Sequence, residues 1–188
     1  MCNRQNLIDI NIMGLQEGQR LLSLLNSDQF TEGFKPAFQS DIGTHFRHIL
    51  EHYRCFFSQL NGNEFRYDIR PRDARLQTDI DYAKTTIYDL IGHLENFDVN
   101  LFEQSFTVSE SYSDAHQNDC FAGGVKTTLE RELMFLQSHT VHHFAMIAAM
   151  TRSLGIQPDE GFGVAIPTRN YARQLDQTKS TFVTKVNS

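Results

Sequence analysis

The sequence predicts an all-α fold, a four-helix bundle with at least one crossover connection. Segments with the 3.6-residue period of an amphipathic helix recur along the chain, polar and turn-rich joints separate them, and strand-like alternation is scarce. Four long helical segments joined by connectors of unequal length suggest a bundle with a crossover connection. The 188 residues, 40% of them hydrophobic, suit one globular domain with its own core.

The first two helices are predicted from apolar periodicity and capping signals. We expect the first over about residues 7–26, where its apolar positions form one broad face. After a loop with glycine and proline, Ser40 and Asp41 offer an N-cap for a second helix that runs to Leu60, where "NGN" at 61–63 ends it.

The third and fourth helices follow irregular connections. The connector "EFRYDIRPRDAR", residues 64–75, is too irregular for a helix, and the third helix is expected from near Thr78 to about Glu95. Residues 97–124 lose the helical period, so we expect a short hairpin or extended excursion there. The last long helix should start at the capping box of "TTLE" and run to Leu154.

Charge and cysteine usage exclude several classes of protein. Seventeen basic against twenty-three acidic residues give a net charge of −6, and scattered basic residues argue against a nucleic-acid partner. Three separated cysteines with no CxxC pair fit reduced thiols in the cytosol. No apolar run approaches a membrane span or a signal peptide, so a cytoplasmic protein without membrane contact is expected.

Three of the eight histidines fall within "SHTVHHFAM" of the last helix. His139 and His143 share its apolar stripe, and their i, i+4 spacing places the two imidazoles on consecutive turns, close enough to bind one metal ion. His142 lies on the flank of the stripe. A metal would offset the cost of burying two neutral imidazoles, so we favour ligands; the alternative is a pair hydrogen-bonded to hydroxyls or water.

The second helix offers a third ligand in "GTHFRHILEHY". The apolar stripe of this helix centres about 130° from His48, whereas His45 and His52 lie nearer to it. Periodicity alone therefore favours His52 or His45. His93 and His116 have no partner spacing and are expected to be structural.

Two stretches resemble the motifs of the DinB-like (DinB/YfiT-like) family of four-helix-bundle metalloproteins. "RHILEHYRCFFSQLNG", residues 47–62, is similar to the first motif, and His48 occupies its histidine position. "SHTVHHFAMI", residues 138–147, is similar to the second, and His139 and His143 match its metal ligands. Two motifs in the right order are moderately specific. The resemblance implies a mononuclear site formed by these three histidines.

The resemblance also decides between the histidines of the second helix. We follow it for His48, because helices in a bundle can face more than one neighbour, and keep His52 or His45 as the alternative ligand. It further implies that residues 1–170 form a single DinB-like domain. The polar composition of residues 171–188 predicts a partly ordered C-terminal tail.

Three neutral histidines leave a coordination position open on Zn²⁺, Ni²⁺ or Fe²⁺, as in catalytic sites. Such a metal lowers the pKa of bound water or holds a thiolate. The resemblance implies a metal-dependent S-transferase that uses a low-molecular-weight thiol, a thiol-dependent isomerase, or a hydrolase acting on a small molecule. Two alternatives are a non-catalytic or stress-related bundle with a structural metal, and a metal-free bundle with hydrogen-bonded histidines.

Two further residues are candidates for a catalytic role. Glu132 lies two turns before His139 on the same face, so it is a candidate acid/base or outer-shell residue; the alternative is a solvated surface glutamate. Arg72, with Arg70, is a candidate contact for an anionic substrate or thiol carboxylate, the alternative being a solvated charge cluster. The broad apolar faces make a homodimer an expectation without a defined interface.

Overall fold

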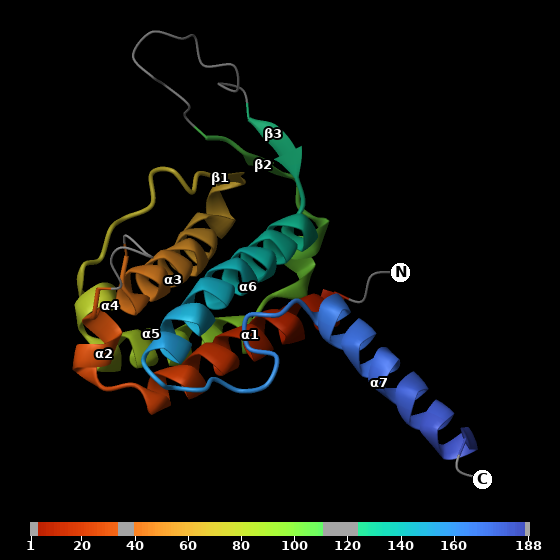
Figure 1. Ribbon diagram of the computed structural model, residues 1–188. Helices are drawn as coiled ribbons and strands as arrows, with labels where there is room; N and C mark the ends of the chain where they lie inside the picture. Colours follow the sequence, from red (N-terminus) through yellow and green to blue (C-terminus); the bar gives the residue numbers. More distant parts are fainter. Residues whose placement is uncertain (1–3, 34–39, 111–123, 187–188) are drawn as a thin grey trace, which may run out of the picture.

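The computed structural model describes residues 4–33, 40–110 and 124–186, and it is mostly helical, with 70% helix. The predicted all-α class is confirmed at this level (Figure 1). The described α-helices are α1 (Arg4–Leu24), α2 (Ser27–Thr31), α3 (Ile42–Gln59), α4 (Arg75–Thr78), α5 (Ile80–Glu95), α6 (Leu129–Ser153) and α7 (Ile166–Val186). Two 3₁₀ turns, η1 (Leu60–Gly62) and η2 (Val99–Glu103), follow α3 and α5.

Four of these helices enclose the core. α1 packs on α5 and α6, and α3 packs on the same two helices, so α3 and α6 lie side by side in Figure 1. The core between them is rich in phenylalanine, and its largest fully buried side chains include Phe30, Phe46, Phe56, Phe65, Phe106 and Phe144. The α3–α6 contact is the one that positions the histidines.

The helix starts follow the expected capping chemistry with small shifts. Asp41 caps α3 by accepting from the Thr44 amide, and Thr128 caps α6 by accepting from the Arg131 amide. Asp79 caps α5, one residue after the expected Thr78, and its carboxylate accepts from the Tyr82 amide at 2.9 Å. Thr78 instead belongs to the short α4, which the connector's irregular composition did not predict.

A small sheet lies beyond the ends of α3 and α6 (Figure 1). Its strands are β1 (Glu64–Phe65), β2 (Phe106–Val108) and β3 (Val125–Thr127). β2 pairs antiparallel with β3, as the predicted hairpin excursion requires, and β1 adds in parallel to β2. The sheet holds the polar connector of residues 64–75 close to the start of α6.

The predicted polar tail belongs, as far as the structure describes it, to a helix. α7 extends through Val186, with proline in its first turn, where a missing N–H costs nothing. Arg169 ties it to α1 by donating to both oxygens of Glu17, at 2.7 and 2.9 Å. The rest of α7 projects away from the other helices in Figure 1, and Tyr171 is exposed.

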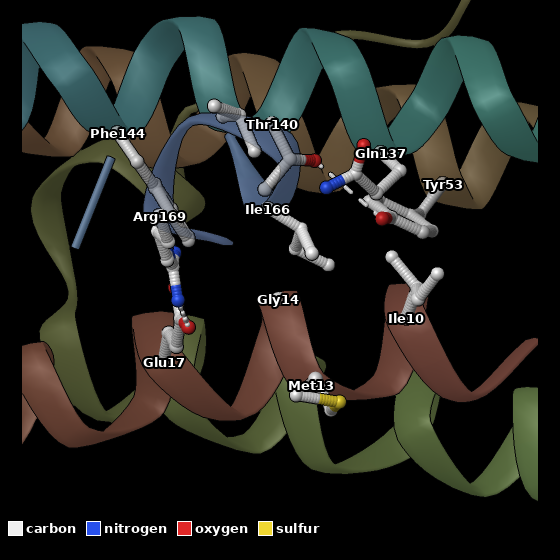
Figure 2. Close-up of a pocket in the computed structure, with 11 residues that line it drawn as sticks. Ile10, Met13, Gly14, Glu17, Tyr53, Gln137, Thr140, Phe144, Ile166 and Arg169 are labelled. Atoms are coloured by element: carbon white, nitrogen blue, oxygen red, sulfur yellow. Dashed lines mark hydrogen bonds and ion pairs between the residues drawn. The ribbon is translucent and has the colours of Figure 1, made fainter. Parts of the chain in front are cut away.

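A cavity between α1, α6 and the start of α7 is too small for a substrate. Figure 2 shows Arg169 reaching Glu17 on one side and Thr140 pointing toward Tyr53 on the other. Its volume is about 20 Å³, whereas one water needs roughly 10–15 Å³. It therefore has room for a single water molecule.

Among the described helices, none is long and apolar enough to cross a membrane. Cys55 is a free and buried thiol, and burial raises its pKa to about 11. Cys2, Cys120 and His116 lie outside the described residues.

Candidate metal centre

α3 and α6 bring three of the predicted histidines together. His48, His139 and His143 each offer one ring nitrogen, and these three atoms lie within 4.8 Å of one another. The Nε2 atom of His139 lies 3.1 Å from Nε2 of His48 and 3.1 Å from Nε2 of His143. The predicted i, i+4 pair thus meets the predicted histidine of the second helix.

The other described histidines are either buried next to these three or exposed to solvent. His45 and His52 are buried beside the three, whereas His142 and His93 are exposed. His52 donates from Nδ1 to the backbone oxygen of His48 at 2.7 Å, because a carbonyl oxygen can only accept. In neutral His52 the lone pair therefore resides on Nε2.

The cluster favours neutral rings. Burial, followed by the neighbouring histidines and Arg70, lowers the pKa of His48 to about 3, and the pKa of His143 falls to about 3 for the same first reason. Burial also lowers the pKa of His139 to about 4 and of His52 to about 3. Neutral imidazoles are the form that ligates metals.

No arrangement of protons on these neutral rings satisfies every contact. Arg70 donates from Nη2 to Nδ1 of His48 at 2.9 Å, so neutral His48 carries its proton on Nε2. That proton occupies the lone pair of His139 Nε2, which then has no second lone pair for the equally close nitrogen of His143. Without a bound cation, the close contact between the Nε2 atoms of His139 and His143 therefore lacks a normal hydrogen bond.

The donor set fits a divalent cation. With Zn–N bonds of about 2.0–2.1 Å, neighbouring ligand nitrogens at a tetrahedral centre stand about 3.3 Å apart. Two of the separations among the three rings are 3.1 Å, close to that value. A cation that accepts one lone pair from each ring would remove the conflict, with His48, His139 and His143 as the residues that hold it.

A buried carboxylate holds the polar connector onto α3. Glu51 is 2% exposed; it accepts from the Asp73 amide at 2.9 Å and from Arg72 Nη1 at 3.2 Å. Arg70 Nε lies 3.5 Å from the same carboxylate, and Arg47 Nε lies 3.7 Å from it. Glu51 thereby keeps Arg70 facing His48. The Arg72 side chain is 57% exposed and is paired with Glu51.

Glu132 is buried rather than solvated. It is 4% exposed and accepts from the Tyr67 hydroxyl at 2.9 Å and from the Thr127 hydroxyl at 2.6 Å. Burial and the Glu132 carboxylate raise the pKa of Tyr67, so this hydroxyl stays a donor. The structure therefore links the first turns of α6 to the connector through a hydrogen-bonded carboxylate.

A pocket of about 580 Å³ adjoins this centre. Its lining includes the buried or half-buried His48, His52, Tyr67, Arg70, Glu132 and Phe135, the exposed cations Lys126 and Arg131, and the exposed carboxylate Glu110. Arg72 does not line it. Of the two predicted catalytic residues, the structure therefore brings Glu132 to the pocket, and it brings Arg70 in place of Arg72.

Comparison with models of known protein families and with curated proteins found no match.

Two contributors, Glu51 and Tyr67, were missed by sequence reasoning. Glu51 was not singled out, although it sits between His48 and His52 in "HILEH". Tyr67 acts through its hydrogen bond to Glu132 on another element, which no local pattern encodes. A signal existed only for Glu51, since an acid on the histidine-bearing face beside an arginine-rich connector has an obvious partner.

Proposed function

We propose that this protein is a metal-dependent enzyme of the DinB-like type, with a four-helix-bundle fold and a divalent ion held by His48, His139 and His143. The observation that supports it is the convergence of three neutral imidazole nitrogens within 4.8 Å beside a pocket. Three protein ligands leave a position for water or substrate. When bound, such an ion lowers the pKa of a water or holds a thiolate as nucleophile.

The pocket supports a small-molecule substrate that approaches from the His48 side. Tyr67 and Phe135, with ring centroids 5.2 Å apart, offer an apolar wall, and Lys126 and Arg131 offer positive charge. Among the residues that the structure describes, neither of these two cations pairs with a carboxylate. A substrate or low-molecular-weight thiol that carries an anionic group fits this lining.

Arg70 acts as a movable donor in this proposal. When His48 Nε2 serves as a ligand, its proton resides on Nδ1 and faces a donor of Arg70, so this contact must open. Glu51, already 3.5 Å from Arg70 Nε, retains the guanidinium close by. The freed N–H groups of Arg70 are then available to an anionic substrate in the pocket.

Glu132 has a positioning or proton-accepting role within the same pocket. Its two hydroxyl donors keep the carboxylate oriented, and it faces the space next to His48 and His52. The exposed Arg72 acts through Glu51, on the far side of Arg70. A cytoplasmic location and a homodimer remain predictions.

The test is the metal content of gently purified protein. We expect about one divalent ion per chain in the parent and none in the His139→Ala/His143→Ala double variant, as measured by elemental analysis. His142→Ala is the matched control, because this exposed histidine of the same helix lies outside the three. Absence of metal from the parent, even after incubation with Zn²⁺, Ni²⁺ and Fe²⁺, would refute the proposal.

A non-catalytic metal site is the second candidate, and the position of His52 favours it. The His52 ring centroid lies 4.4 Å from those of His48 and His139, and its lone pair resides on Nε2. A fourth histidine would close the coordination shell, as in structural sites. Cobalt substitution separates the two: the absorption bands shift on addition of a small thiol if a position is open, and stay unchanged if His52 closes it.

A further inference from the structure

We propose that His45 is a positioning residue that fixes the tautomer of His143 so that its Nε2 atom is free to bind the metal. This inference rests on the proposed function. It gives a role to a buried histidine that belongs neither to the three ligands nor to the pocket lining.

The two rings meet through a single pair of nitrogens. Nδ1 of His45 lies 2.8 Å from Nδ1 of His143, and the ring centroids are 5.1 Å apart. At this distance one nitrogen must carry a proton and the other a lone pair. Nε2 of His143 points to the opposite side, toward His139 at 3.1 Å.

Only one direction of this hydrogen bond is compatible with ligation. If His45 donated, neutral His143 would hold its proton on Nε2 and could not bind a metal through that atom. If His143 donates from Nδ1, its Nε2 carries the lone pair. A hydrogen bond to the second nitrogen is the usual device that sets the tautomer of a metal-binding histidine.

The contact of His45 with Ser40 is compatible with the same direction. Once its Nδ1 accepts, neutral His45 carries its proton on Nε2, which lies 2.8 Å from the Ser40 hydroxyl oxygen and can donate to it. His45 is held at the start of α3, next to the Asp41 cap, and is 8% exposed. The chain of bonds therefore runs from His143 through His45 to Ser40, and every member has a partner.

Three variants test this role. His45→Phe keeps a ring and removes both nitrogens, so it abolishes the acceptor. His45→Asn keeps an acceptor at the δ position and should restore part of the effect. His93→Phe is the matched control, because His93 is an exposed histidine of α5 outside the cluster.

The first readout needs no metal. In long-range proton–nitrogen NMR spectra of the metal-free protein, the His143 ring, assigned by its loss in His143→Ala, should show the Nδ1–H tautomer. In His45→Phe it should lose this preference and populate Nε2–H. A change in packing alone would not exchange one tautomer for the other.

The second readout is zinc affinity from competition with a chromophoric chelator. Loss of an outer hydrogen-bond partner typically weakens metal binding about 10–100-fold. We expect a loss in this range for His45→Phe, a smaller loss for His45→Asn and no change for His93→Phe. If His45→Phe does not fold, His45→Asn and Ser40→Ala carry the test with smaller losses in the same direction.

The outcomes separate this inference from the proposed function. Zinc binding by the parent together with an unchanged affinity and an unchanged His143 tautomer in His45→Phe would overturn the role of His45 and leave the metal centre intact. A parent that binds no zinc would overturn both. An Nε2–H tautomer in the metal-free parent would show that His45 donates, which also refutes the role.

Discussion

Removal of the Glu51 charge should destabilise the protein, because this carboxylate is the buried partner of the arginine-rich connector. Its side chain is 1% exposed, and the Arg70 side chain beside it is 8% exposed. Glu51→Gln preserves the volume but places a neutral amide among donors, so Arg70 loses its counter-charge. The exposed Arg72 can turn to water, and it contributes little to the cost.

The expected loss in unfolding free energy follows from the burial of the Glu51 and Arg70 side chains. Breaking a buried ion pair by removal of one partner costs about 3–5 kcal/mol, and weakening a hydrogen bond to a charged group costs about 1.5–3 kcal/mol. Because Gln can still accept from the Asp73 amide, we expect about 3 kcal/mol, which lowers Tm by roughly 6–12 °C for a chain of this length.

The assay is urea and thermal denaturation followed by circular dichroism at neutral pH. The exposed Glu95→Gln of α5 is the matched control, for which we expect a change within about 0.5 kcal/mol. A loss below about 1 kcal/mol for Glu51→Gln would refute the argument that this charge anchors the connector.

Three further predictions concern stability. The cluster histidines have pKa values of about 3–4 when folded, so below the ordinary histidine pKa of about 6.5 the unfolded chain binds more protons than the folded protein. The urea concentration at the unfolding midpoint of the metal-free protein should therefore be lower at pH 5.5 than at pH 7.5. A higher midpoint at pH 5.5 would contradict the direction of the pKa shift. Tyr53→Phe removes the donor that reaches buried Asn11 at 2.7 Å, and calorimetry should show a loss of about 1–3 kcal/mol; a Tm equal to that of the parent would contradict it. Gly163→Ala should lower Tm more than Gly155→Ala. Both glycines have φ near +70°, but a Cβ at Gly163 would lie 2.6 Å from a backbone nitrogen, whereas Gly155 faces open space. Equal losses of Tm would contradict the close backbone contact at Gly163.

The sequence predicts the helices and the histidine pair because both depend on local periodicity. His139 and His143 stack on consecutive turns in any α-helix, and their place in the apolar stripe requires a neighbour. Asp41 and the capping box before α6 fix where helices begin. These features depend on residues within one or two turns of each other.

The helical wheel chose against His48 because α3 has more than one packed neighbour. This helix contacts α4 and α5 as well as α6, so the centre of its apolar stripe is not the direction of α6. The resemblance to a known motif supplied His48, and the structure brings that residue to His139 and His143.

The surroundings of the site were less predictable, since they depend on contacts between elements. The sequence left Glu132 open between a site residue and a solvated surface acid, and only the contacts with Tyr67 of the connector and Thr127 of β3 bury it. Arg72 and Arg70 are equivalent in the sequence, and only the fold assigns one to solvent and the other to His48. α7 was missed because its polar composition hides a helix that one arginine anchors to α1.

The claim that three histidines from two helices share one divalent ion is tested most directly by cobalt titration of single variants. We expect one ion per chain in the parent, with binding abolished in His48→Ala and retained in His52→Ala, as followed by the visible absorption bands of cobalt. Retained binding in His48→Ala, or no binding by the parent, would contradict it.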